Sequence, residues 1–135
     1  MKFKEMASLS SHNKSLVIHI LQQMIDSCDY ITEWNKDITD PNIYPSSPSG
    51  MQVMAATCML IESIGEGIKK IDRLAPEYLK SQAPETPWKE IKGLRDHIAH
   101  GYFNLDADII FDVAMNEIPQ LRPILIELKS ILQKT

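Results

Sequence analysis

The residues of this chain whose types suit catalysis gather in one short stretch, Arg95-Asp96-His97-Ile98-Ala99-His100-Gly101-Tyr102. A histidine such as His100 has a reference pKa of about 6.5, so it can take up or release a proton near neutral pH. The Arg95 guanidinium keeps its charge and donates hydrogen bonds in a fork that matches a phosphate. The stretch therefore predicts acid–base chemistry beside a phosphate group. Such chemistry needs no metal ion or other cofactor, and we expect none.

The spacing of five residues between Arg95 and His100 limits how the two can cooperate. On a straight helix with 3.6 residues per turn they point about 140° apart, so they do not share a face. Three arrangements would bring them together: the arginine side chain reaches around the helix, the last turn unwinds before Gly101, or a symmetric dimer joins the two groups across its axis. Asp96 lies four residues before His100, and we expect it to orient the imidazole and favour its charged form.

Read as Arg95-x4-His100-x-Tyr102, the stretch resembles the signature of the HEPN superfamily, and specifically of its HepT-like ribonuclease branch. Asp96 fits the Asn or Asp that typically follows the arginine there, whereas His97 is additional to the pattern and receives no role. The bare motif is weakly specific, and three flanking features of the same layout strengthen it: Ile64-Gly65-Glu66, Pro87-Trp88 and Phe103-x-x-Asp106. The resemblance covers roughly residues 12–131, so we treat residues 1–135 as a single HEPN/HepT-like domain.

The resemblance implies a metal-independent RNA endonuclease that is the toxin of a toxin–antitoxin pair. His100 would act as general acid or base, Arg95 would stabilise charge on the phosphate, and the RNA substrate, tRNA or mRNA, would supply its own 2′-hydroxyl as nucleophile. The partner would be a nucleotidyltransferase antitoxin that transfers AMP to Tyr102, and the added anion would repel RNA phosphate. The resemblance also implies a homodimer with the motif in a cleft between the subunits.

Plainer interpretations of the same residues are also open. Arg95 and Asp96 could form a solvated charge pair near a helix end, which is the commoner role of adjacent charges. Glu66 could pair with Lys70 on the helix surface, or it could be a buried carboxylate that faces Arg95 and supports it. The alternative function is a non-catalytic dimeric subunit that binds a nucleotide or a nucleotidyltransferase, and a helical scaffold without a site is the third.

The length and composition limit the classes of protein to which the chain can belong. A chain of 135 residues suffices for one domain with its own core. Its net charge of -4 argues against a general nucleic-acid coat protein, which would bind through Lys and Arg, so any contact with RNA must be local. Cys28 and Cys58 lie in apolar helical patterns without zinc-ligand spacing, and we expect buried thiols. With no signal sequence and no apolar run of membrane-spanning length, we expect a soluble cytoplasmic protein.

Apolar periodicity predicts an all-α, up-and-down antiparallel bundle of four principal helices. The first spans about residues 12–36 and the second residues 51–71, with an exposed proline-rich loop over residues 40–50 between them. Gly65 and Gly67 weaken the second helix, so we expect another helix backbone to approach closely there.

The second half of the chain is expected to hold the motif and the last helices. A short helix over residues 77–82 precedes a third helix that is capped by Thr86, carries the motif and ends at Gly101. Asp106 begins a further helix, and Asn116 caps the last one, which Pro123 should bend.

Overall fold

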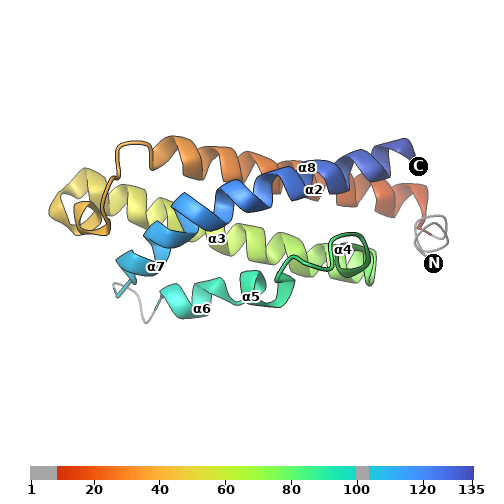
Figure 1. Cartoon of the computed structure of the whole chain (residues 1–135). Helices are drawn as coiled ribbons and strands as arrows, with labels where there is room; N and C mark the ends of the chain where they lie inside the picture. The colour runs from red at the N-terminus through yellow and green to blue at the C-terminus, as the bar shows by residue number, and fades with distance from the viewer. Residues whose placement is uncertain (1–8, 100–103) are drawn as a thin grey trace.

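The computed structural model of the chain describes residues 9–99 and 104–135, and every regular element of that part is a helix. The elements are α2 (Ser11–Trp34), η1 (Pro41–Ser46), α3 (Pro48–Leu74), α4 (Tyr78–Gln82), α5 (Trp88–Lys92), α6 (Leu94–Ile98), α7 (Ala107–Asp112), η2 (Val113–Glu117) and α8 (Ile118–Lys134). The long helix α2 packs against both α3 and α8, while α4, α5 and α6 lie along a second side of α3 (Figure 1). The predicted all-α bundle is confirmed.

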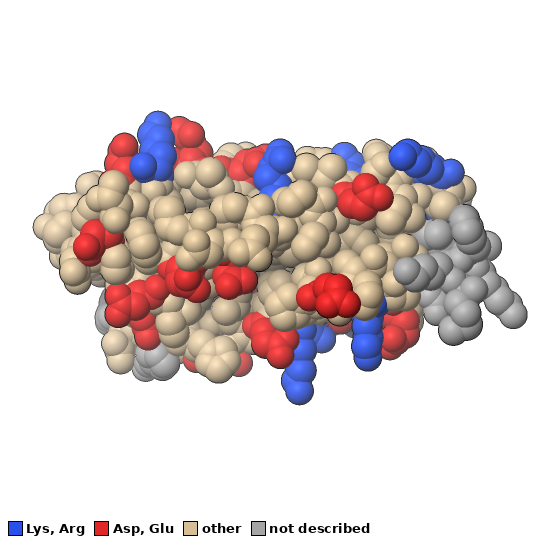
Figure 2. Space-filling view, viewed as in Figure 1, with Lys and Arg blue, Asp and Glu red and all other residues tan. Residues whose placement is uncertain are grey.

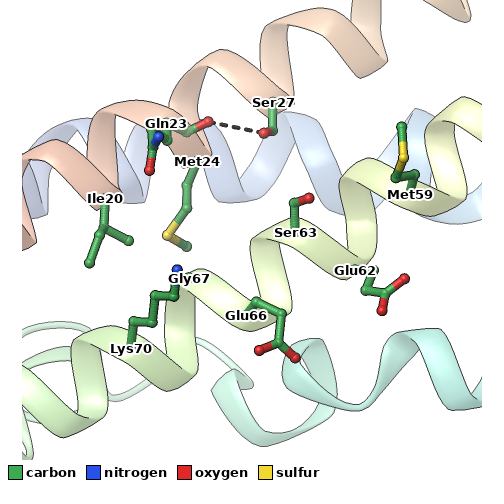
Figure 3. Close-up of a pocket in the computed structure, with 10 residues that line it drawn as sticks. All are labelled: Ile20, Gln23, Met24, Ser27, Met59, Glu62, Ser63, Glu66, Gly67 and Lys70. Carbon is green, nitrogen blue, oxygen red and sulfur yellow. Dashed lines mark hydrogen bonds between the residues drawn. The ribbon is translucent and has the colours of Figure 1, made fainter.

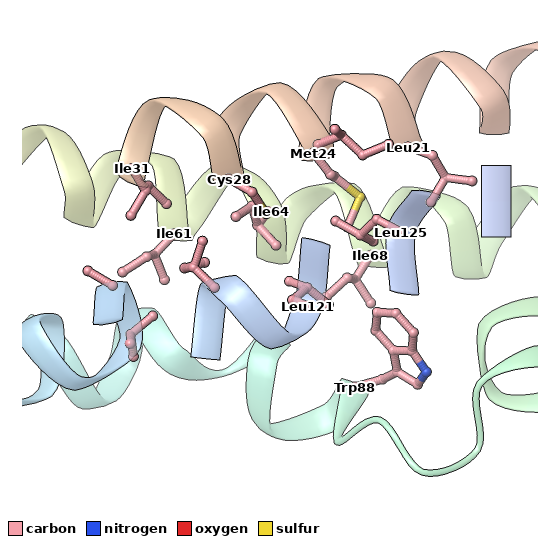
Figure 4. Close-up of a cluster of buried hydrophobic side chains, with 14 of the residues drawn as sticks. Leu21, Met24, Cys28, Ile31, Ile61, Ile64, Ile68, Trp88, Leu121 and Leu125 are labelled. Carbon is pink, nitrogen blue, oxygen red and sulfur yellow. The ribbon is translucent and has the colours of Figure 1, made fainter. Parts of the chain in front are cut away.

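The long helices form because capped first turns precede apolar residues at steps of three and four. The Ser10 side chain accepts a hydrogen bond from the Asn13 N–H, and the Ser47 side chain accepts one from the Gly50 N–H, with Pro48 at the first helical position. The buried faces of α2, α3 and α8 meet in one core, part of which Figure 4 shows. Its labelled members are Leu21, Met24, Cys28, Ile31, Ile61, Ile64, Ile68, Trp88, Leu121 and Leu125.

The connection between α2 and α3 differs from the exposed loop that we expected. Residues Pro41–Ser46 form a 3-10 helix, η1, and the Tyr44 side chain is fully buried. The Tyr44 hydroxyl donates to the Asn35 side-chain oxygen, and the Asn35 amide donates to Thr57 Oγ1 at 2.9 Å and to the Ile31 carbonyl at 2.8 Å. This buried network ties η1 to α2 and α3, which explains why a proline-rich segment is ordered and packed.

The last helices form one nearly continuous rod instead of two separately capped ones. Asp106 caps α7 as predicted, because its side chain accepts a hydrogen bond from the Ile109 N–H at 3.1 Å. Asn116 does not cap a helix; it lies in η2, a π-helical turn, and donates to Asp112 Oδ1. The change of hydrogen-bond register ends directly before Pro119, which has no N–H to donate. The prediction of a new cap at Asn116 was therefore wrong.

The third predicted helix is divided into two short ones. α5 ends at Gly93 and α6 begins directly after it, so the motif-bearing segment is two five-residue helices. Thr86 is buried and does not cap the helix, which corrects the prediction. The N-cap position of α5 is occupied by Pro87, and no side chain makes a capping hydrogen bond there. α5 is fixed instead by Trp88, which is nearly buried and donates from its indole Nε1 to the Ala83 carbonyl at 3.0 Å.

Candidate functional site

The segment that carries the motif is placed by its contact with α3. A Cβ at Gly65 would lie only 3.2 Å from the Lys92 carbonyl oxygen and 3.6 Å from Lys92 Cα, so the backbone of α5 packs directly on this glycine. The close backbone approach that we predicted is confirmed at Gly65. At Gly67 the neighbour is different: a Cβ would meet the side chain of Met24, with its Sδ at 2.9 Å.

Two ion pairs tie α5 and α6 to α3 further. Lys92 Nζ lies 3.3 Å from Asp72 Oδ2, and Arg95 Nε lies 3.2 Å from Glu62 Oε2. The Arg95 side chain is 53% exposed and that of Glu62 is 46% exposed, so the second pair stands at the surface where a ligand can reach it. Arg95 is therefore not a free surface charge, and its partner is a residue that the sequence did not single out.

Arg95 and Glu62 line an open pocket of about 470 Å³. The other residues that line it are Ala55, Cys58, Met59, Ala99 and Leu105. A second groove of about 450 Å³ between α2 and α3 shares Met59 and Glu62 with the first, so the two adjoin. Figure 3 shows this second groove, with the Glu62 and Glu66 carboxylates pointing away from α2 and the Met24 sulfur above Gly67.

Cys58 reports on the electrostatics of the Arg95 pocket. Burial raises the pKa of its thiol, the negative charge of Glu62 raises it further, and the positive charge of Arg95 lowers it. The thiol is therefore neutral at physiological pH and is a poor nucleophile. Both Cys28 and Cys58 are free and buried, as predicted.

The motif residues after Arg95 are only partly within the described structure. Asp96 and His97 are exposed, Ile98 is buried, and α6 ends there because Ala99 is extended, with φ -103° and ψ 113°. The helix thus ends before His100 rather than at Gly101, which corrects the predicted boundary. His100 and Tyr102 lie outside the described residues, so their predicted roles are untested.

Backbone contacts join residues 98–99 to residues 105–106. Ala99 and Leu105 form an isolated antiparallel bridge, and the Asp106 N–H donates to the Ile98 carbonyl at 2.8 Å. Leu105 and Ala99 both line the Arg95 pocket. The described residues on either side of positions 100–103 therefore include two, Ala99 and Leu105, that line this pocket.

Glu66 does not make the contact with Arg95 that one of our interpretations gave it. Its carboxylate pairs with Lys69 at 3.1 Å and is 53% exposed, so it forms a surface ion pair, although with Lys69 and not with Lys70. Glu62, one turn earlier on α3, is the carboxylate that meets Arg95. The sequence could not distinguish them, because residues four apart lie on one face of a helix and the register of α6 on α3 decides which is reached.

The surface shows no further feature that points to a nucleic-acid, metal or membrane site in the described residues. Acidic and basic side chains are interspersed over the face seen in Figure 2, without a broad basic patch. Within residues 9–99 and 104–135, no group of three His, Cys, Asp or Glu side chains could hold a metal ion. None of the helices in this part of the chain is both long and apolar enough to cross a membrane.

Comparisons with known proteins give a consistent result. A family model described as "Ribonuclease HepT-like" matches residues 46–128. "Putative RNase TTE0752" of Caldanaerobacter subterraneus subsp. tengcongensis is 30% identical over 114 residues, which cover 84% of this chain and 92% of that protein. "Putative RNase MJ0125" of Methanocaldococcus jannaschii is 29% identical over 102 residues, 76% of this chain and 81% of that protein. "Probable ribonuclease HepT" of Thermococcus cleftensis is 28% identical over 102 residues, 76% of this chain and 86% of that protein. No solved structure matches the chain.

Proposed function

The chain belongs to the HepT-like ribonuclease family, and from this premise we propose that it is a metal-independent RNA endonuclease and the toxin of a toxin–antitoxin pair. The observation that carries the proposal is the position of Arg95. Its side chain is half exposed, lines an open pocket of about 470 Å³ and forms an ion pair with Glu62. A permanent cation in such a place suits a phosphodiester of the substrate.

In the proposed reaction the 2′-oxygen of the RNA attacks the adjacent phosphorus. A base removes the 2′-hydroxyl proton, the bond between phosphorus and the 5′-oxygen breaks, and an acid protonates that oxygen. Arg95 stabilises the charge that builds on the phosphate, His100 supplies acid or base catalysis, and Asp96 orients the histidine. The products carry a 2′,3′-cyclic phosphate and a 5′-hydroxyl, which makes the mechanism open to direct assay.

The proposal includes a homodimer and a partner enzyme. Four large apolar side chains are exposed on α2 and α3, and one of them, Met59, lines the pocket, which supports association of two copies through these helices: Tyr30, Trp34, Met51 and Met59. A nucleotidyltransferase antitoxin would transfer AMP from ATP to the Tyr102 oxygen with release of pyrophosphate. The new phosphate would place a negative charge within a few residues of Arg95 in sequence and so exclude RNA.

The test is cleavage of total RNA and of tRNA in the presence of EDTA. Wild-type protein should produce fragments with 2′,3′-cyclic phosphate ends, and Arg95→Ala and His100→Ala should each lose the activity by about 10²-fold or more. Arg122→Ala is the matched control, because Arg122 is also a half-exposed arginine in an ion pair, with Asp29, on the α2–α8 side of the bundle. Cleavage that persists in the His100 and Arg95 variants would contradict the mechanism.

A second function is favoured by the net charge of -4, which makes the chain a poor general binder of RNA. In this alternative the protein is a non-catalytic dimeric subunit that binds a nucleotide or a nucleotidyltransferase. A dimer that carries unmodified Tyr102, as shown by intact mass, and that cleaves no RNA but binds the partner enzyme would support the alternative over the nuclease.

A further inference from the structure

The ion pair between Glu62 and Arg95 joins a long helix to a very short one. Glu62 stands on α3, a helix of 27 residues whose neighbouring positions Ile61 and Ile64 are buried in the core. Arg95 stands on α6, a helix of five residues, which is far too short to hold its own conformation in water. The orientation of the Arg95 side chain therefore depends on its contacts, and among the described residues its ion-pair partner is Glu62.

The contact is made at the end of the guanidinium that lies nearest the main chain. Glu62 Oε2 lies 3.2 Å from Nε, the nitrogen nearest the arginine chain. The donors on Nη1 and Nη2, which point away from the main chain, form the fork that fits two oxygens of a phosphate. A carboxylate on the Nε side can thus restrain the guanidinium, while that fork can face a phosphate.

We propose that Glu62 is a positioning residue that holds the Arg95 guanidinium for the scissile phosphate of RNA, an inference that rests on the proposed function. Glu62 does not touch the reacting atoms; it acts through Arg95. The pair adds little to the stability of the fold, because ion pairs between exposed side chains are weak. Its effect is on the reaction, since a guanidinium that is already oriented loses less freedom when the charge on the phosphate develops.

This role predicts opposite effects of Glu62 on turnover and on substrate binding. Without the carboxylate the guanidinium is free to rotate, so kcat falls. At the same time a negative charge next to the phosphate site is removed, so RNA binds at least as well and KM falls or stays the same. A variant that was merely less well folded would lose activity without this combination.

The experiment compares Glu62→Gln with Glu66→Gln. Both changes remove one negative charge from the same face of α3, one helical turn apart, but Glu66 pairs with Lys69 and not with Arg95. We expect Glu62→Gln to lower kcat about tenfold and KM about twofold, and Glu66→Gln to leave kcat within about twofold of wild type. Equal unfolding midpoints in urea show that all three proteins are folded. An unchanged kcat in Glu62→Gln, or an equal loss in Glu66→Gln, overturns the proposal.

A second measurement does not depend on cleavage. The Nε–H signal of Arg95 in a ¹H–¹⁵N spectrum is assigned by its absence in Arg95→Lys, and Glu62→Gln should shift it while Glu66→Gln should not. The two measurements separate the possible failures. A wild-type protein that cleaves no RNA refutes the proposed function, and with it the role of Glu62. If the wild-type protein cleaves RNA but Glu62→Gln changes neither the Arg95 signal nor kcat, or changes only one of them, the role of Glu62 alone is refuted.

Discussion

Replacing Gly65 by alanine is expected to lower the rate of RNA cleavage about fourfold while the fold stays about as stable as in the wild type. Alanine favours a helix interior over glycine by about 1 kcal/mol, so α3 itself gains from the change. The added Cβ, however, would lie 3.2 Å from the Lys92 carbonyl oxygen, closer than an ordinary contact. That oxygen belongs to the backbone of α5 and cannot rotate away, so α5 must move outward by roughly 0.3 Å to restore contact.

The displacement is passed on to Arg95, because α6 follows α5 after Gly93. A misplacement of about 1 Å can lower a rate about 10²-fold, so a shift of roughly 0.3 Å should lower kcat/KM about fourfold. The same shift offsets the gain in helix propensity, and we expect the free energy of unfolding to stay within about 1 kcal/mol of wild type.

Gly67→Ala is the matched control two residues along α3. The Cβ there would meet Met24 Sδ at 2.9 Å, but a thioether at the end of a flexible side chain can move aside. We expect this variant to cleave RNA at the wild-type rate. Initial cleavage rates on a labelled RNA and urea unfolding curves give both quantities for each variant. Wild-type activity in Gly65→Ala, or an equal loss in Gly67→Ala, would refute the argument that α5 positions Arg95 through this contact.

Three further predictions concern buried groups. Asn35→Ala removes the hydrogen-bond partner of the buried Thr57 and Tyr44 hydroxyls, so urea unfolding should show a loss of about 2–5 kcal/mol; a loss below about 1 kcal/mol would contradict this. Burial raises the pKa of Cys28 from 9.0 to about 12, so the folded state favours the neutral thiol. The contribution of this thiol to the free energy of unfolding is therefore fully present below pH 9 and falls by about 1.4 kcal/mol per pH unit towards pH 12. Urea unfolding between pH 9 and 11 should show a shallower decline in Cys28→Ala, and an unchanged slope would speak against the assignment. Cys58 should react slowly with a thiol reagent at pH 8 in the native state, faster in Glu62→Gln and slower still in Arg95→Ala, because Glu62 raises its pKa and Arg95 lowers it; equal rates in all three would count against the pocket electrostatics.

The sequence predicted those parts of the fold that depend on periodicity. The two long helices and the start of α7 at Asp106 follow from apolar spacing and capping residues, which act locally. The burial of Tyr44 could not be predicted in this way. It depends on Asn35, which follows the end of α2, and on Thr57 of α3, so a proline-rich segment that is typical of an exposed loop contributes a side chain to the core.

The sequence pointed to the motif of the candidate site but not to the residues that surround it. The family to which the resemblance pointed is confirmed, whereas the catalytic role of Arg95, inferred from its type and spacing, stays a prediction. Glu62 was missed in favour of Glu66, because the choice depends on how α6 is seated against α3. The division at Gly93 was missed as well, since a single glycine inside an apolar repeat costs only about 1 kcal/mol and does not by itself predict a break.

The bridge between Ala99 and Leu105 bears on how the protein could be altered by design. The two residues are joined to each other, and the Asp106 N–H donates to the Ile98 carbonyl, so these backbone contacts close the chain on either side of residues 100–104. Doubling the length of a closed loop costs only about 0.6 kcal/mol. Variants of residues 100–104, His100 and Tyr102 included, should therefore keep the helical frame, so a loss of RNA cleavage in them would report on chemistry and not on folding.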